Sequence, residues 1–164
     1  MIHSLLHNSL FYGDILSIRQ ALIGDAHAIK QLVSSLSHFY LESEGGSLPV
    51  WFENTLNIAE FERRLSSGKF THFVYLSNNN VVGYISIKEG GRLYHLFVDG
   101  SYQGKGVAKK LWRFSTSRLN EKVYTVRSSI YAVPVYKSFG FEVSGELASK
   151  EGIHFQPMRL QFVN

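Results

Sequence analysis

The sequence predicts a single α/β domain in which helices pack on a mixed β-sheet. Its 164 residues, 45% of them hydrophobic and 18% charged, suit one domain with a buried core. Segments with the three- and four-residue spacing of amphipathic helices alternate with short apolar segments typical of strands. No linker, repeat or low-complexity tract divides the chain. We therefore expect one domain over residues 1–164, with the element order βααβββαβαββ.

The first part of the chain predicts one strand and two helices. Residues 15–19 form a short apolar run that ends before a Gly-Asp turn, which is typical of a strand. Residues 25–36 carry apolar side chains at helical spacing, namely Ala28, Ile29, Leu32, Val33 and Leu36. Residues 41–52 contain two glycines and a proline and predict a loop, whereas residues 55–65 regain helical spacing.

The rest of the chain predicts several strands and two further helices. Aromatic and β-branched residues mark the strands, and Asn-rich or Gly-rich turns separate the first three of them. In chain order we expect strands at residues 70–76, 81–87 and 93–98, a helix from about 107 to 120, a strand at 123–126, a helix at 132–139, and strands at 141–143 and 153–162.

The charge of the chain favours an anionic partner. The net charge is +4 and the pI is about 9.3, so nucleic acid, an anionic membrane surface and a phosphorylated small molecule are all candidates. No run of about 20 apolar residues could span a membrane. Residues 1–16 lack the basic start of a secretory signal, so we expect a cytoplasmic protein. The absence of cysteine excludes disulfides, thiolate metal sites and cysteine nucleophiles.

Residues 1–14 precede the first expected strand and form an N-terminal extension. It could be a dimer arm, an added helix or a tail, so the oligomeric state stays open, with a dimer as one option. His3 and His7 have a spacing that can hold a metal ion on a helix. Because no third ligand accompanies them, we expect no metal site.

The stretch with the most chemical information combines a strand, a glycine-bearing turn and a helix start. It runs over residues 96–108, LFVDGSYQGKGVA. Unpaired N–H groups and the helix dipole at such a start bind phosphate, and glycines let the backbone approach the anion. Lys105 is not followed by Ser or Thr, as a Walker loop requires, and Lys109 stands where a dinucleotide motif needs its third glycine. Without this context, Gly104 and Gly106 would be ordinary turn residues.

The loop pattern resembles that of a known family. Gln103-x-x-Gly106-x-Ala108 is similar to the pyrophosphate loop Q/R-x-x-G-x-G/A of the Gcn5-related N-acetyltransferase (GNAT) family. Residues 132–141, AVPVYKSFGF, are similar to the family's later helix, A-x-x-x-Y-x-x-x-G-F, and Ile18-Arg19-x-Ala21 with Asp25-Ala26 is similar to its first strand and turn. The resemblance covers about residues 15–162 and implies a GNAT fold, with a splayed central sheet and helices on both faces.

The same resemblance implies acetyl-CoA as cosubstrate, bound between two splayed strands. It implies that the backbone of Leu96, Phe97 and Val98 pairs with the pantetheine arm. It also implies a pyrophosphate contact by the loop and helix start, formed by Gln103, Gly104, Lys105, Gly106, Val107, Ala108 and Lys109. Tyr136 matches the family's general acid, which protonates the departing thiolate; the alternative is a plain core aromatic. Ser129 stands where many members have a cofactor-binding asparagine.

A basic cluster lies beside this loop, formed by Lys105, Lys109, Lys110 and Arg113. These side chains are either a solvated helix face or a contribution to binding the CoA phosphates. The cluster lacks the interleaved aromatic residues of a nucleic-acid platform. We therefore do not expect nucleic acid as a partner.

The general base is less well defined by the sequence. An amine acceptor is mostly protonated at neutral pH and must lose a proton before it attacks. His95 lies on the strand that borders the expected cosubstrate, and imidazole titrates near neutrality, so His95 is our candidate base. A buried, hydrogen-bonded structural histidine is the equal alternative. Glu89, Glu142 and His154 are weaker candidates, and a water chain could replace them all.

The expected loop at residues 41–52 carries groups that could contact the acceptor, because the corresponding loop often borders the acceptor in this family. Glu42, Glu44, Trp51 and Phe52 could hold a cationic amine. Alternatively, the acids are solvated and the aromatic rings belong to the core.

The resemblance thus implies an enzyme, an acetyl-CoA-dependent N-acetyltransferase. It would transfer the acetyl group by direct attack to a primary amine of a small molecule or peptide, with Tyr136 as general acid. The alternative is a catalytically silent acyl-CoA-binding regulatory module with the same fold.

Overall fold

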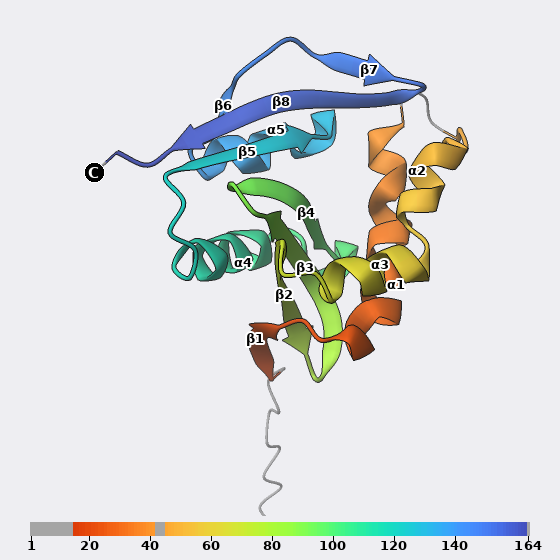
Figure 1. Cartoon of the computed structure of the whole chain (residues 1–164), viewed down its shortest axis with the longest axis vertical. Coiled ribbons are helices and arrows are strands. Elements are labelled where there is room, and N and C mark those ends of the chain that lie inside the picture. The colour runs from red at the N-terminus through yellow and green to blue at the C-terminus, as the bar shows by residue number, and fades with distance from the viewer. Residues whose placement is uncertain (1–14, 42–44, 164) are drawn as a thin grey trace, which may run out of the picture.

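The computed structural model describes residues 15–41 and 45–163 and shows a sheet with helices on both faces (Figure 1). The expectations for residues 1–14, including the pair His3 and His7, and for Glu42 and Glu44 lie outside the described residues. The helices and strands are β1 (Leu16–Gln20), α1 (Ala26–Leu36), α2 (Val50–Thr55), α3 (Ile58–Leu65), β2 (Phe70–Ser77), β3 (Asn80–Lys88), β4 (Arg92–Val98), α4 (Val107–Thr116), β5 (Val123–Ser128), α5 (Val133–Ser138), β6 (Glu142–Val143), β7 (Ala148–Lys150) and β8 (Ile153–Gln161).

This order contains every expected element and adds one helix and one strand. The prediction of a loop up to Phe52 is wrong for residues 50–52, because α2 begins directly after Pro49. The Pro49 carbonyl accepts the N–H groups of Phe52 and Glu53, both at 2.9 Å, so the proline starts a helix here and does not break one. β7 is too short to show a strand period in the sequence and exists through its pairing with β8.

α4 ends earlier than its apolar spacing predicts. The hydroxyls of Ser115, Thr116 and Ser117 donate to backbone carbonyls of the preceding turn at 2.8, 3.1 and 2.8 Å. Such local bonds offer the backbone an alternative to continued helix. The helix therefore stops at Thr116 and not near residue 120.

The sheet is splayed at its only parallel junction among the described strands. Its order is β1-β2-β3-β4-β5-β8-β6, with β7 also on β8, and all pairs except β4–β5 are antiparallel. β4 and β5 pair only where Arg92 meets Thr125 and Leu93 meets Val126. Beyond Leu93, β4 continues to Val98 without β5 beside it. The expected splay is therefore present.

Two apolar cores hold the helices against the sheet. One core packs α1 and α3 on one face of the N-terminal strands, through Ile29, Val33, Phe61, Val74 and Tyr84. The other joins α4 and α5 to the opposite face and reaches the C-terminal strands, through Ile85, Leu111, Trp112, Tyr136 and Met158. Neighbouring residues of β2 alternate between the cores, as a strand that is buried on both faces requires. The second core is the one that connects the two halves of the splayed sheet.

Within residues 15–41 and 45–163, no helix is long and apolar enough to cross a membrane. The same residues contain no group of three or more histidine, aspartate or glutamate side chains placed to hold a metal ion.

Candidate active site

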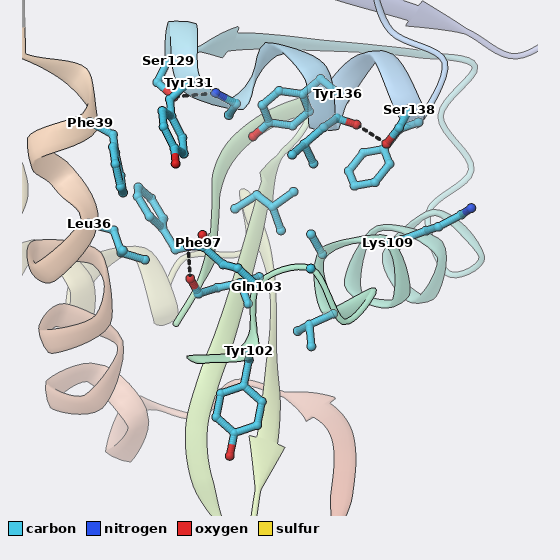
Figure 2. Close-up of a pocket in the computed structure, with 18 of the residues that line it drawn as sticks. Leu36, Phe39, Phe97, Tyr102, Gln103, Lys109, Ser129, Tyr131, Tyr136 and Ser138 are labelled. Atoms are coloured by element: carbon cyan, nitrogen blue, oxygen red, sulfur yellow. Dashed lines mark hydrogen bonds between the residues drawn. The ribbon is translucent and has the colours of Figure 1, made fainter. Parts of the chain in front are cut away.

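A cavity of about 470 Å³ lies where β4 and β5 separate (Figure 2). This volume falls in the range of small-molecule sites. Most residues predicted to bind the cosubstrate line the cavity, namely Leu96, Phe97, Val98, Gln103, Gly104, Gly106, Val107, Ala108, Lys109 and Ser129. Tyr136 lines it as well, whereas Lys105 and His95 do not. The Lys105 ammonium lies instead 5.4 Å from the centre of the Tyr102 ring.

β4 presents a free backbone edge to this cavity. One edge of β4 pairs with β3 as far as Val98, but the edge toward β5 is paired only at Arg92 and Leu93. Backbone polar groups of residues 96–98 on that side therefore lack a strand partner among the described residues, although the Val98 carbonyl accepts from the Gln103 side chain. An extended ligand with amide groups can pair with such an edge as an added strand does.

The loop before α4 offers backbone N–H groups to a ligand. Gln103 Nε2 donates to the Val98 carbonyl at 2.9 Å, so this side chain fixes the loop against the end of β4. Gly106 precedes α4 with a φ of +80°, a left-handed conformation that favours glycine. A Cβ added at Gly104 or Gly106 would meet no atom within 4 Å. A helix start that faces open space fits a pyrophosphate group.

Tyr136 lies on α5 at the opposite wall of the cavity (Figure 2). Its ring packs edge-on against Phe139 and Phe141, with ring centres 6.1 and 5.6 Å away. Burial raises the pKa of Tyr136 well above its usual value, and Tyr40 raises it further. The phenol is therefore protonated at neutral pH and can donate a proton or a hydrogen bond.

Ser129 uses its hydroxyl within its own turn. The Ser129 Oγ accepts from Ala132 N at 3.2 Å and so caps the turn that leads into α5 (Figure 2). The residue still lines the cavity, next to Tyr131 and Tyr136. Its side chain thus has a structural task at the position where the family resemblance implies a cofactor contact.

The sequence interpretation missed an aromatic wall contributed by the turn after α1. Phe39 stacks on Tyr131, with ring centres 4.4 Å apart, and Tyr131 is 67% exposed (Figure 2). Tyr40 also lines the cavity, and the neighbouring Leu41 pairs with Ile153 of β8. The sequence signal was the aromatic pair at residues 39–40 just beyond an amphipathic helix, but the ring on which Phe39 stacks lies far along the chain.

A second cavity of about 180 Å³ lies against β4, and Tyr40 and Phe97 line both cavities. The rings of these two residues have centres 6.4 Å apart. The further lining includes aromatic and basic side chains, namely Trp51, Phe52, Arg92, Tyr94, His95, Arg127, Lys150 and Phe155. Tyr40 and Phe97 thus form a wall that the two cavities share.

His95 belongs to the second cavity and is packed among rings. Phe61, Tyr84, Tyr94 and Phe97 all have ring centres within 5.9 Å of the imidazole. Burial, together with the nearby charges of Arg64 and His72, lowers the pKa of His95 to about 3. A neutral imidazole with so low a pKa accepts a proton weakly, which argues against His95 as the base. The hydrogen bond expected of a structural histidine is not seen at Nδ1, which is buried without a partner among the described residues.

The other candidate bases lie away from the gap. Glu89, Glu142 and His154 line neither of the two cavities. Glu89 belongs to the turn between β3 and β4, where its N–H donates to the Lys69 carbonyl at 2.8 Å.

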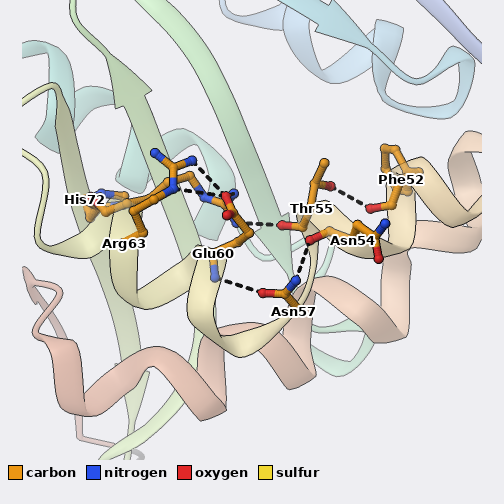
Figure 3. Close-up of polar contacts among 8 residues, drawn as sticks. Phe52, Asn54, Thr55, Asn57, Glu60, Arg63 and His72 are labelled. Atoms are coloured by element: carbon orange, nitrogen blue, oxygen red, sulfur yellow. Dashed lines mark hydrogen bonds and ion pairs between the residues drawn. The ribbon is translucent and has the colours of Figure 1, made fainter.

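A polar cluster fixes the helix that carries Trp51 and Phe52 (Figure 3). Asn57 caps α3 by accepting from Glu60 N at 2.9 Å and donates to the Asn54 carbonyl at 2.8 Å. The buried Arg64 donates to the Thr55 carbonyl at 2.8 Å, at the end of α2. These bonds hold α2 at a set position beside the second cavity.

These features agree with a match to a known family. The acetyltransferase (GNAT) domain model matches residues 40–162 of the chain. The chain therefore belongs to the GNAT acetyltransferase family, which confirms the resemblance seen in the sequence.

Individual relatives show how far this likeness extends. The spermine/spermidine N(1)-acetyltransferase of Bacillus subtilis (strain 168) is 34% identical over 68 residues, which cover 36% of this chain and 45% of that protein. The match thus spans less than half the length of that relative. PaiA N-acetyltransferase of Thermoplasma acidophilum, solved in complex with coenzyme A, has a TM-score of 0.73 at 13% identity over 90% of this chain and 99% of its own. YncA of Salmonella typhimurium, solved with acetyl-CoA, has a TM-score of 0.65 at 24% identity over 92% and 95%. At these identities the two structures show the shared fold.

Proposed function

We propose that the protein is an acetyl-CoA-dependent N-acetyltransferase that acts on a primary amine. The observation that carries this proposal is the cavity at the splayed β4–β5 junction. It combines a free strand edge at residues 96–98, an open glycine loop before α4 and the protonated phenol of Tyr136. These three features match the amide-rich arm, the pyrophosphate and the leaving thiolate of an acyl-CoA.

Each part of the site has a separate task in this proposal. Acetyl-CoA supplies an activated thioester. The free edge of β4 binds and orients the extended arm, and a backbone N–H near Val98 stabilises the oxyanion. The N–H groups around Gly104 and Gly106 bind the pyrophosphate. Tyr136 donates a proton to the departing sulfur.

The acceptor amine approaches through the second cavity, since Tyr40 and Phe97 border both cavities at the gap. The amine must arrive neutral or lose its proton on the way. His95 lines this route, but its pKa of about 3 makes it a weak acceptor for an ammonium proton. In this proposal the proton leaves to water and His95 shapes the cavity.

The substitution Tyr136→Phe tests the proposed acid. Phenylalanine keeps the ring and its packing on Phe139 and Phe141 but removes the donor. We expect kcat and kcat/KM to fall by about 10²-fold, the lower end for general acid catalysis, because a thiolate is a good leaving group. The dissociation constant for acetyl-CoA should stay nearly unchanged. The measurement is CoA release with an amine that the wild type acetylates, together with calorimetric titration of acetyl-CoA.

The matched control is Tyr124→Phe, which removes a hydroxyl from a buried tyrosine outside both cavities. It should keep wild-type turnover. A wild-type kcat for Tyr136→Phe, with chemistry shown to be rate-limiting, would mean that Tyr136 only packs. Tight acetyl-CoA binding with no transfer to any peptide, polyamine or amino-sugar acceptor would instead support the silent binding module.

A further inference from the structure

The second cavity, which borders β4 on the route proposed for the acceptor, is lined by positive charges that no carboxylate of the described residues pairs with. Arg92, Arg127 and Lys150 line it, and no Asp or Glu is among the described residues of its lining. The ion pairs formed within residues 15–41 and 45–163 involve other cations, namely Arg19, Arg63 and Arg64. The three lining cations thus have no carboxylate partner among the described residues.

The sheet register explains why cations from distant parts of the chain meet here. Arg92 of β4 pairs with Thr125, so Arg127, two residues further along β5, projects from the same face. Arg127 pairs with Pro157 of β8, and Phe155 lies two residues before that position, again on this face. β7 then places Lys150 opposite Ile153, two residues before Phe155. Strand pairing therefore directs all three cations toward one cavity.

Aromatic rings hold two of these cations in place. The Arg127 guanidinium lies 5.2 Å from the centre of the Phe155 ring, and the Lys150 ammonium lies 4.4 Å from the centre of the Trp51 ring. A cation on a ring face keeps its outward N–H groups available for an anion. Trp51 Nε1 adds a buried donor that has no hydrogen-bond partner among the described residues.

This arrangement selects among the amines that the proposed function allows. A polyamine would bring several positive charges against Arg92, Arg127 and Lys150, which disfavours it. An anionic group would instead receive charge-assisted hydrogen bonds from the guanidinium groups. We propose that the second cavity binds a primary amine that also carries a carboxylate or phosphate group, which Arg92, Arg127 and Lys150 bind while the amine reaches the gap at Tyr40 and Phe97. The acetylation of this amine rests on the proposed function.

Matched acceptors test this assignment. Phenylalanine is compared with phenethylamine, and O-phosphoethanolamine with ethanolamine, so that only the anionic group differs within each pair. Spermidine is the cationic comparison. CoA release with acetyl-CoA reports transfer, and calorimetric titration of each amine into the CoA-saturated protein reports binding. We expect a kcat/KM at least about 10-fold higher for the anionic member of one pair, and the pair that responds tells carboxylate from phosphate.

Substitutions then assign the effect to the cavity. Arg127→Gln and, separately, Arg92→Gln should raise the KM for the anionic member by about 10- to 100-fold and leave its neutral counterpart nearly unchanged. The control is Lys69→Gln, which removes an exposed cation away from both cavities. It should change the KM of neither the anionic amine nor its neutral counterpart. The double variant Glu42→Gln/Glu44→Gln tests the competing hypothesis that these two carboxylates bind a cationic amine such as spermidine.

The outcomes separate this inference from the proposed function. If anionic amines bind in an Arg127-dependent way but no amine is acetylated, the inference holds and the enzyme proposal fails. The inference is overturned if anionic amines gain nothing over their neutral counterparts in either binding or transfer. It is also overturned if spermidine is the preferred acceptor and loses that preference in the Glu42→Gln/Glu44→Gln variant.

Discussion

At the scale of single residues, burial shifts two ionisable groups near the strand gap in opposite directions. It raises the pKa of Tyr136 and lowers that of His95 to about 3, because desolvation disfavours the charged form of each group. Both side chains are therefore neutral at pH 7. The neutral form of Tyr136 carries the proton that a general acid must donate. The low pKa of His95, in contrast, removes the driving force for taking a proton from the amine.

The His95 pKa predicts a loss of stability in mild acid. The unfolded histidine binds a proton below its ordinary pKa of 6.5, while the folded one stays neutral down to about 3, so stability falls with pH across this window. Between pH 7 and pH 5 this one group should remove up to about 2 kcal/mol of the free energy of unfolding. The variant His95→Gln, which cannot titrate, should lose that much less over the same interval.

Urea unfolding of both proteins at the two pH values measures this difference. His72, whose pKa burial also lowers, remains in both proteins and cancels in the comparison. An equal loss of stability in wild type and variant would mean that folded His95 titrates normally, and it would restore His95 as a candidate base.

Motif-bearing residues could be located from the sequence, but cavity-lining residues from other elements could not. The segments at residues 96–108 and 132–141 each carry a local pattern, and the structure brings them together around one cavity. The stack of Phe39 on Tyr131 depends on a contact between the turn after α1 and the turn before α5. No local spacing encodes such a contact. Likewise, the sequence shows His95 on a strand but not the rings that surround it.

At the scale of elements, hydrophobic period predicted the long strands and helices, while α2 and β7 depend on specific partners. α2 has only six residues after Pro49 and is held by Asn57 and Arg64. β7 pairs through only three residues. Elements this short carry too few residues for a period to appear. Their positions matter, because α2 and β7 supply Trp51 and Lys150 to the second cavity.

The β4–β5 junction predicts a strong difference between two adjacent glycines. Gly91 and Gly90 both have positive φ, +75° and +79°. A Cβ at Gly91 would lie 2.1 Å from the Val123 carbonyl oxygen, whereas one at Gly90 meets no atom within 4 Å. Gly90→Ala should cost about 1–2 kcal/mol of stability through left-handed strain alone. Gly91→Ala should cost at least about 2 kcal/mol more, because the backbone of β5 must move.

Chemical denaturation of the two variants decides this point. Gly91→Ala should also weaken acetyl-CoA binding, since the displaced strands form the pairing from which the gap opens. Similar losses of stability for the two substitutions would show that the junction tolerates a side chain.

At the scale of the whole molecule, basic side chains line both cavities. Lys109 lies at the cavity proposed for acetyl-CoA, in keeping with the anionic partner that the net charge of +4 suggested. A second group of cations, Arg92, Arg127 and Lys150, gathers at the other cavity. These three are far apart in sequence and meet only through strand register, so composition alone could not place them.

The architecture also predicts how acetyl-CoA should stabilise the molecule. The two halves of the sheet meet through two residue pairs between β4 and β5 and through the core around α4. The cavity proposed for acetyl-CoA is lined by the end of β4 and by α4 on one side and by residues 129–139 on the other. At a concentration of 100 times its Kd, acetyl-CoA should add about 2.7 kcal/mol to the free energy of unfolding. The hydrogen-exchange rates of those amides of β2 and β3 that exchange through global unfolding should then fall by about 100-fold.

Hydrogen exchange followed by mass spectrometry tests this coupling. Peptides from β4 and the loop at residues 99–106 should gain protection together with peptides from residues 129–139, because the proposed ligand bridges them. β1 lies at the far edge of the sheet and should gain only the protection that the higher global stability provides. Protection confined to one side of the gap would mean that the ligand binds one half of the sheet without joining it to the other. An unchanged melting temperature with saturating acetyl-CoA would mean that acetyl-CoA does not bind in this cavity.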